Sequence, residues 1–183
     1  MKISNTSLPE VLLIEPKVLN DPRGFFFELW NRAAFQKSGL PREFAQDNVS
    51  FSRGGVLRGL HFQHPGGQGK LISVLEGEIF DVAVDIRPNS PHFKKWVGVN
   101  LSSKNHHQLW IPEGFAHGFF VLSDIALVSY KATDFYCPQS ETTVLWNDPD
   151  INIQWPMGTP DLSDKDRVGT PLSAISPDKL PKA

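Results

Sequence analysis

Short runs of alternating apolar and polar residues recur along most of this chain. In GEIFDVAVDIR, at 77–87, every second residue over Phe80–Ile86 is a large apolar one. WVGVNL at 96–101 alternates in the same way, and ALVSYKA at 126–132 places alternate residues, among them Tyr130, on one face. Alternation with a period of two is typical of strands with one buried face. The pattern therefore predicts many short β-strands.

Only two helices are expected between and after these runs. Asn31 is suited to cap a helix with the body RAAFQKS, and Gly39 is suited to end it. A second short helix is expected to open at Ser163, where SDKD resembles a capping box. Fourteen glycines and 15 prolines interrupt the rest of the chain. Many short strands with few helices predict an all-β fold, and we favour a jelly-roll barrel.

Length and composition define the class of protein further. A chain of 183 residues is about one domain, so we expect a single domain over 1–183 with a proline-spaced surface tail at 169–183. The formal net charge of −2 argues against a nucleic-acid partner. Cys137 is the single cysteine, so no intrachain disulfide can form, which fits a reducing compartment. No apolar segment is typical of a signal peptide or a membrane span, so we expect a cytoplasmic protein without a membrane partner.

The stretch VLRGLHFQHPGGQGKL, at 56–71, carries basic groups within an apolar strand. Arg58 and His61 are three residues apart, so a regular strand would point them to opposite faces. Gly59 lies between them, and a glycine inside a strand often marks a bulge. A bulge at Gly59 would bring both basic groups to the same face. In the alternative interpretation, Arg58 lies in solvent and His61 is a hydrogen-bonded histidine of the core.

Other polar residues occur where an apolar core is expected. His117 lies among phenylalanines in PEGFAHGFFV, and Arg23 and Glu28 flank three phenylalanines in DPRGFFFELW. Gln46 and Asn48 lie in the strand-like FAQDNVSFS. Each alone is compatible with a structural role. Together they predict a polar cavity inside a β-barrel, which is a common place for a small-molecule site.

The histidines are also candidate metal ligands. The P-x-G-x-x-H spacing that ends at His117 resembles the second motif of the cupins, which are jelly rolls. Metal-binding cupins usually add an H-x-H pair and a carboxylate, whereas this chain offers only His61 and His64, three residues apart, with no glutamate shortly after them. The HH pair at 106–107 is expected in an exposed turn. Metals of this class need three or four converging ligands, so we predict a cupin-like barrel without a metal site.

Several motifs together resemble, in chain order, those of the dTDP-4-dehydrorhamnose 3,5-epimerase family: DPRGFFFELW, QDNVSFSRGGVLRGLHFQ, QGKL, GEIFDVAVDIR, WVGVNLS, QLWIPEGFAHGF, YKATDFY, LWNDP and LSDKD. The resemblance extends from about Leu8 to Val168. It implies a double-stranded β-helix (a cupin jelly roll) that works as a homodimer without a metal or redox cofactor. The implied reaction inverts carbons 3 and 5 of dTDP-4-dehydro-6-deoxy-D-glucose and gives dTDP-4-dehydro-L-rhamnose.

The resemblance also assigns catalytic roles that fit this chemistry. Both carbons flank the C4 ketone, so each can lose a proton to give an enolate, and inversion needs a base on one face and an acid on the other. By resemblance His61 is the base, Asp166 orients it, Tyr130 returns the proton and Lys70 stabilises the charge on O4. Without the family, each has a structural interpretation: a core histidine, a carboxylate at a helix end, a core tyrosine and a surface lysine.

Further residues match substrate-binding positions of the family. Arg23 and Arg58 suit the diphosphate because arginine binds phosphate oxygens in bidentate fashion. Relatives commonly carry two tyrosines where this chain has Phe135 and Tyr136, and Phe135 is our candidate for the ring against thymine. The remaining positions are Phe26, Glu28, Gln46, Asp47, Asn48, Lys70, His117, Glu141 and Lys165.

Three alternatives stay open from the sequence. A metal-dependent cupin enzyme would use the histidines as ligands. A non-catalytic sugar-binding barrel would keep the pocket without needing the His61, Asp166 and Tyr130 set. A related epimerase would invert only one carbon, or act on another 4-keto nucleotide sugar. The sequence does not determine the nucleotide preference or the order of the two inversions.

Overall fold

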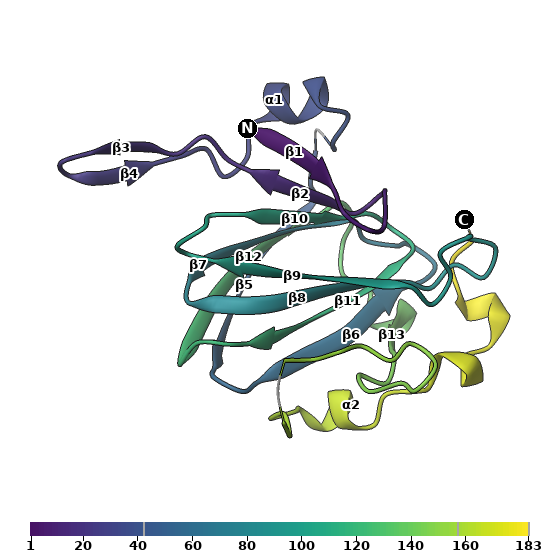
Figure 1. Cartoon of the computed structure of the whole chain (residues 1–183). Helices are drawn as coiled ribbons and strands as arrows, with labels where there is room; N and C mark the ends of the chain where they lie inside the picture. The colour runs from purple at the N-terminus through teal and green to yellow at the C-terminus, as the bar shows by residue number, and fades with distance from the viewer. Residues whose placement is uncertain (42, 157, 183) are drawn as a thin grey trace.

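Two antiparallel sheets face one another in the computed structural model of the chain, which describes residues 1–41, 43–156 and 158–182 (Figure 1). The strands are β1 (Lys2–Asn5), β2 (Leu12–Glu15), β3 (Leu19–Asp21), β4 (Gly24–Phe26), β5 (Gln46–Arg53), β6 (Leu57–Gln63), β7 (Lys70–Glu76), β8 (Glu78–Asp85), β9 (Trp96–Ser102), β10 (Gln108–Ile111), β11 (Phe115–Val121), β12 (Ile125–Ala132) and β13 (Glu141–Thr143). The helices are α1 (Arg32–Lys37) and α2 (Asp164–Arg167), with short 3₁₀ turns η1 (Pro138–Ser140), η2 (Leu172–Ala174) and η3 (Pro177–Lys179).

The strand order confirms the predicted all-β jelly roll. The six-stranded sheet runs β1-β2-β10-β7-β12-β5, and the five-stranded sheet runs β13-β6-β11-β8-β9. Neighbours in both sheets pair antiparallel, and many of them are distant in sequence, as with β10 beside β2 and β7. The three alternating segments singled out in the sequence are β8, β9 and β12.

Apolar residues from both sheets fill one part of the space between them. Ile72 and Val128 point inward from the six-stranded sheet and belong to the same buried cluster as Ile79 and Val121 of the other sheet. Ile72, Val128 and Ile79 are fully buried. Burying such side chains stabilises the fold by roughly 1.5–3 kcal/mol each. This packed region supports the pocket described below.

The five-stranded sheet is buried on its outer face as well. Val82 and Val84 of β8 point outward and pack with Leu172, Ile175 and Leu180 of the C-terminal segment. These three C-terminal residues are buried, so the expectation that the tail lies loosely on the surface is wrong at these positions. The outward direction of the valines leaves the alternate residues of β8 facing the interior of the barrel.

The helices are short and are capped as the sequence predicts. Asn31 Oδ1 accepts a hydrogen bond from the backbone N–H of Ala34 at 3.1 Å, and Gly39 adopts a positive φ of 74° after α1. Phe35 of α1 packs with Trp110 on the outside of the six-stranded sheet. Within the described ranges, no helix is long and apolar enough to cross a membrane.

The hairpin β3–β4 projects away from the barrel as an arm (Figure 1). Phe25 and Phe26 are exposed on it, Phe26 to 65%. At its base, the ring of His106 lies 4.6 Å from the ring of Phe25 and 4.9 Å from that of Phe27. His106 is therefore half-buried against the arm, although the sequence suggests an exposed turn. An arm with large exposed apolar side chains is a candidate contact surface.

Candidate active site

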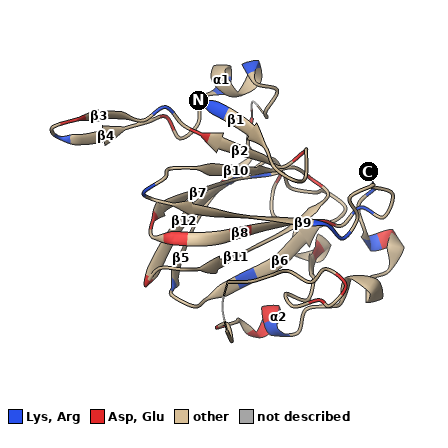
Figure 2. Ribbon diagram, in the orientation of Figure 1, with Lys and Arg blue, Asp and Glu red and all other residues tan. Residues whose placement is uncertain are grey.

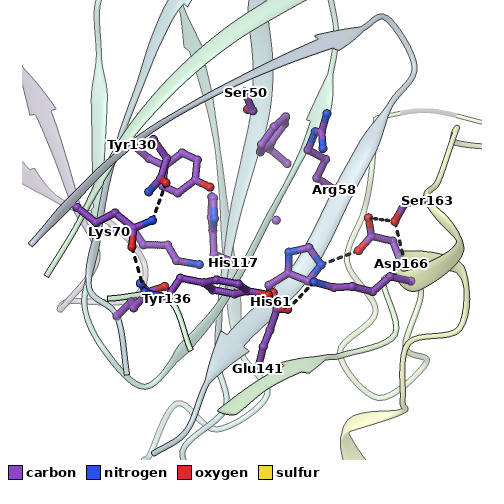
Figure 3. Close-up of a pocket in the computed structure, with 16 residues that line it drawn as sticks. Ser50, Arg58, His61, Lys70, His117, Tyr130, Tyr136, Glu141, Ser163 and Asp166 are labelled. Carbon is purple, nitrogen blue, oxygen red and sulfur yellow. Dashed lines mark hydrogen bonds and ion pairs between the residues drawn. The ribbon is translucent and has the colours of Figure 1, made fainter. Parts of the chain in front are cut away.

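A cavity of about 400 Å³ lies between the two sheets, next to the apolar core (Figure 3). This is within the usual size range of small-molecule sites. The residues that line it are Gln46, Asn48, Ser50, Arg58, His61, Gln68, Lys70, His117, Gly118, Phe119, Tyr130, Tyr136, Glu141, Ser163, Lys165 and Asp166.

A bulge at Gly59 brings Arg58 and His61 to the same pocket. In the pairing of β6 with β11, His61 lies opposite His117 and Arg58 lies opposite Phe119, so β6 has one more residue than β11 in this interval. Gly59 has a φ of 118°, and a Cβ there would lie 2.7 Å from the carbonyl oxygen of His117. Glycine is thus required both by the backbone conformation and by the close approach of β11. The predicted bulge is confirmed.

His61 is paired with a carboxylate that comes from α2. His61 Nε2 lies 2.6 Å from Asp166 Oδ1. Ser163 caps α2 by accepting from the backbone N–H of Asp166, and its hydroxyl donates to Asp166 Oδ2 at 2.8 Å. A carboxylate on Nε2 favours the tautomer with Nε2 protonated, which leaves Nδ1 as the basic nitrogen.

The environment keeps Asp166 ionised. Burial acts to raise the pKa of Asp166, but hydrogen bonds from His61 and Ser163 and the charge of His61 outweigh it and hold the pKa below its usual value. Acidic and basic residues alternate along α2 (Figure 2). Among them, Asp166 is the buried one. An ionised partner of this kind stabilises a histidine that takes up a proton.

Tyr130 faces the pocket from the other sheet. It belongs to β12, whereas His61 belongs to β6, so the two line opposite walls of the cavity (Figure 3). Burial raises the pKa of Tyr130, and the nearby charge of Glu141 adds to this, while Arg58 opposes it. The phenol therefore keeps its proton near neutral pH and can donate it.

Lys70 opens β7 and lines the same pocket. Burial lowers the pKa of Lys70 to about 8, and the carboxylates of Glu141 and Asp81 limit the fall. Near pH 7 the side chain is thus largely a cation in a poorly solvated place. Such a group interacts strongly with a developing negative charge.

Glu141 joins two other pocket residues. Its Oε2 accepts a hydrogen bond from the hydroxyl of Tyr136 at 2.8 Å and lies 2.7 Å from Lys165 Nζ (Figure 3). Burial acts to raise the pKa of Glu141, but Lys165 and Tyr136 outweigh it and lower the pKa. The backbone N–H of Tyr136 donates to Gln46 Oε1 at 3.0 Å. Tyr136 is therefore held at both its backbone and its hydroxyl.

Arg58 is fixed by β5. Its Nε donates to Ser52 Oγ at 2.9 Å, and its Nη2 donates to the carbonyl oxygen of Phe51 at 3.1 Å. These bonds leave other N–H groups of the guanidinium free to bind an anion in the pocket.

His117 forms a second pair with a carboxylate. His117 Nε2 lies 2.8 Å from Asp81 Oδ1, and the Asp81 side chain is fully buried. Asp81 is one of the β8 residues that face the interior because the valines beside it face outward. The strand pattern places Asp81 inside, but it does not indicate that its partner is His117.

Two predicted binding residues lie outside the pocket. Asp47 is exposed and pairs with Lys131 Nζ at 2.7 Å, because alternation along β5 turns it away from the face that carries Gln46. Phe135 is 68% exposed and does not line the cavity, whereas Tyr136 does. Neither side chain lines the cavity of this chain.

Three further predicted residues belong to the arm and its base. Arg23 pairs with Asp21 at 2.6 Å, Glu28 accepts from Asn31 Nδ2 at 2.8 Å, and Phe26 is exposed. They do not line the cavity of their own chain, because β3–β4 points away from the barrel. By contrast, the structure brings together His61, Asp166, Tyr130, Lys70, Gln46, Asn48, Arg58, His117, Glu141 and Lys165.

Several pocket residues were missed from the sequence. Ser50 follows Asn48 by two positions on a strand, so alternation alone could have found it. Ser163 was predicted as a cap but not as a support of Asp166. Tyr136 was passed over in favour of its neighbour, and no sequence signal separates the two.

The pocket offers few side chains to a metal ion. Among the described residues, no three His, Cys, Asp or Glu side chains are arranged to hold one. His61 and His117 each use Nε2 on a carboxylate, and His64 does not line the cavity. The absence of a metal stays a prediction.

Comparison with known proteins gives a consistent result. A sequence model described as dTDP-4-dehydrorhamnose 3,5-epimerase matches residues 5–174. The dTDP-4-dehydrorhamnose 3,5-epimerase of Shigella flexneri is 57% identical over 171 residues, with 92% of this chain and 94% of that protein covered. The Pseudomonas aeruginosa protein of the same name is 53% identical, and the match again covers 92% of this chain and 94% of that protein.

A solved structure agrees with these relatives. The dTDP-6-deoxy-D-glucose-3,5-epimerase of Legionella pneumophila, in complex with dTDP-4-keto-L-rhamnose, superposes with a TM-score of 0.97. It is 50% identical in sequence, and the match covers 100% of this chain and 98% of that one.

Proposed function

This chain belongs to the dTDP-4-dehydrorhamnose 3,5-epimerase family, and from that premise we propose how its pocket inverts carbons 3 and 5 of dTDP-4-dehydro-6-deoxy-D-glucose. The product is dTDP-4-dehydro-L-rhamnose. The observation that carries the proposal is the placement of His61 and Tyr130 on opposite walls of one cavity. Inversion requires a base on one face of the sugar and an acid on the other.

The stereochemistry of the substrate fits a single base. In the gluco configuration, the hydrogens on carbons 3 and 5 lie on the same face of the ring. His61 can therefore reach both from one side, and Tyr130 can protonate both carbons from the other. Because both carbons lie next to the C4 ketone, deprotonation to an enolate and reprotonation suffice, so the proposed route needs no redox cofactor.

Each inversion begins at His61. Nδ1 takes the proton from the carbon next to the ketone, the electron pair of the C–H bond forms the new C=C bond to C4, and the π pair of the C4 carbonyl moves onto O4. The imidazolium that forms is stabilised by the ionised Asp166 on Nε2. Lys70 donates to the enolate oxygen, a contribution worth about 3–4 kcal/mol in a dry site.

Tyr130 completes the inversion. The enolate collapses back to the ketone while carbon takes the phenolic proton from the opposite face. This leaves His61 protonated and Tyr130 ionised, so both must exchange protons with solvent before the next inversion. Deuterated solvent should therefore label each carbon that is inverted.

The remaining pocket residues bind the nucleotide part. Arg58 binds the diphosphate, supported by its fixed geometry on β5. Tyr136, held by Glu141, supplies the ring against thymine in place of Phe135. Gln46, Asn48, His117 and Lys165 bind further polar groups of the substrate.

The enzyme works as a homodimer in which the arm of one chain completes the pocket of the other. Arg23 and Phe26 match binding positions of the family, yet they lie on an arm that points away from the cavity of their own chain. A symmetric pair of chains can exchange two such arms. Arg23 would then add a second cation at the diphosphate, and Phe26 a second aromatic ring.

The direct test of the reaction is incubation with the 4-keto nucleotide sugar in D₂O, followed by NMR. We expect dTDP-4-dehydro-L-rhamnose with deuterium at both carbons 3 and 5. Deuterium and inversion at one carbon alone would identify a mono-epimerase. Unchanged substrate without deuterium would reject the proposed reaction and favour a binding barrel.

The shared pocket is tested by mixing two defective variants, Arg23→Ala and His61→Asn. In a mixed dimer, one pocket combines an intact His61 with an intact arm. Random exchange of chains should therefore restore about a quarter of the wild-type sites. No recovery after refolding the chains together, although both variants dimerise, would contradict the exchange of arms.

A further inference from the structure

One hydroxyl in the pocket has no partner within the described chain. Ser50 Oγ is buried and forms no hydrogen bond to the described residues, although Ser50 lines the cavity (Figure 3). Native proteins rarely leave a buried polar group unpaired. Ser52, two residues further along β5, uses its hydroxyl to accept from Arg58. Ser50 is thus the serine of this pair whose hydroxyl is not already paired with a described residue.

The register of β5 places Ser50 between two functional groups. Tyr130 lies opposite Asn48, two residues before Ser50, and Arg58 is bound at Ser52, two residues after it. A strand rises by about 3.3 Å per residue, so Ser50 is about 7 Å along the backbone from either position. A ligand group at Ser50 therefore lies between the proton donor and the cation for the diphosphate.

If the proposed function holds, the position of Ser50 indicates which group of the substrate lies beside its hydroxyl. The diphosphate is attached to carbon 1, and the reacting carbons are 3 and 5. The group between carbons 1 and 3 is the hydroxyl on carbon 2, and the group between carbons 1 and 5 is the ring oxygen. A serine hydroxyl both donates and accepts, as does the C2 hydroxyl, whereas a ring oxygen only accepts.

We propose that Ser50 binds the C2 hydroxyl of the sugar and selects 2-hydroxy over 2-deoxy 4-keto nucleotide sugars. The discrimination arises because an analogue without this hydroxyl leaves Ser50 buried and unpaired. Ser50 thereby acts on specificity, while His61 and Tyr130 carry the proton transfers.

The test compares wild type and Ser50→Ala on dTDP-4-dehydro-6-deoxy-D-glucose and on its 2-deoxy analogue. Wild type should lose about tenfold in kcat/KM on the analogue, as expected for one neutral hydrogen bond. Ser50→Ala should lose about tenfold on the parent substrate and turn over both compounds equally. The proposal would be overturned if Ser50→Ala lost kcat/KM equally on both compounds, because the variant would then keep the wild-type preference for the 2-hydroxy sugar.

A matched control removes a hydroxyl from the other face of the same sheet. Ser129 alternates with Tyr130 on β12 and therefore points away from the cavity. Ser129→Ala should leave kcat/KM and the preference unchanged, and thermal unfolding of both variants shows whether the fold is kept.

A binding measurement, which does not depend on turnover, tests the assignment of Ser50 independently of the proposed reaction. The dissociation constants of dTDP-L-rhamnose and its 2-deoxy analogue should differ about tenfold for wild type and not for Ser50→Ala. A wild type that discriminates in binding but gives no inversion would reject the proposed reaction and keep the assignment of Ser50. Equal binding of the two compounds by wild type would reject Ser50 and leave the reaction untouched.

Discussion

Two histidine–aspartate pairs lie side by side in this pocket, and they are built differently. His61 and His117 are register partners on β6 and β11, and each uses Nε2 on a carboxylate. Asp166 comes from α2, and Ser163 binds its second oxygen. Asp81 comes from within the sheet, and its second oxygen has no partner among the described residues.

The surroundings of the two imidazoles differ as well. The side chain of His61 is 25% exposed and that of His117 is 10% exposed. A base that must return its proton to solvent needs some access to water, and its carboxylate must stay fixed while the charge on the ring changes. The His61 pair meets both needs. The more enclosed His117 pair suits a fixed polar wall that binds substrate.

Replacing each histidine by asparagine should give the largest contrast. His61→Asn removes the proposed base, so inversion and deuterium exchange should both fall by roughly 10²–10⁴-fold. His117→Asn should raise KM while exchange continues at saturating substrate. The measurement is NMR of the substrate in D₂O for both variants. Equal loss of exchange in the two variants would remove the distinction between the pairs.

Replacing Asp166 and Asp81 by asparagine should give a smaller difference in kcat between the two pairs, again with the larger loss at the His61 pair. Asp166→Asn keeps the shape but no longer stabilises an imidazolium at His61, so kcat should fall by roughly 10²-fold, the lower end of what a general base contributes. Asp81→Asn should affect KM more than kcat, because it changes a binding wall. Steady-state kinetics of both variants at saturating substrate check this, and a larger loss of kcat in Asp81→Asn would reverse the assignment.

The pH dependence of kcat/KM should reveal the loss of the positive charge of Lys70, which lies near both Asp81 and Glu141. Because its pKa is about 8, the ammonium is present below pH 8 and is lost as the pH rises through this value. Above pH 8, kcat/KM should fall towards tenfold per pH unit. Tyr130 does not cause this limb, since its pKa is raised from 10.

Lys70→Gln is the control for that limb. The variant should have a low kcat/KM at all pH values, and its kcat/KM should not change between pH 7 and about 9, because the group that titrates there is gone. A limb at pH 8 that persists in Lys70→Gln would assign it to another residue.

Ser163→Ala should have the smallest effect. It removes the cap of α2, at a cost of about 1 kcal/mol in the free energy of unfolding. It also removes one of the hydrogen bonds that keep Asp166 ionised, so kcat should fall only a few-fold. Chemical denaturation and kcat report the two effects separately, and an unchanged kcat would show that Ser163 is not needed to hold Asp166 in place.

Elements of the fold could be predicted from the sequence where nearby residues determine the conformation. These residues are the alternating apolar positions of a strand, the capping residue of a helix or a glycine inside a strand. β8, β9 and β12, the caps Asn31 and Ser163, and the bulge at Gly59 are examples. A glycine in the interior of a strand weakens the strand and often marks a bulge, which is why the bulge at Gly59 could be predicted.

Burial by distant segments could not be predicted in this way. The C-terminal residues Leu172, Ile175 and Leu180 are widely spaced in sequence, and they are buried in a cluster with residues of β6, β8 and β11 that are distant from them in the chain. Phe135 and Tyr136 differ by one position, and the path of the chain after β12 decides which one faces the cavity. Arg23 and Phe26 lie on an arm that points away from the cavity of the same chain, and no pattern of residues indicates that direction.

The central claim is that His61 and Tyr130 act from opposite faces, and Tyr130→Phe tests it most directly. The variant keeps the base and Lys70 but has no phenolic proton to deliver. His61 should still remove the proton, exchange it with solvent and return it to the same face. In D₂O the substrate should therefore gain deuterium at carbons 3 and 5 while it keeps its configuration, and inversion should fall far more than exchange. Equal loss of exchange and inversion, with substrate affinity and fold intact, would contradict the account.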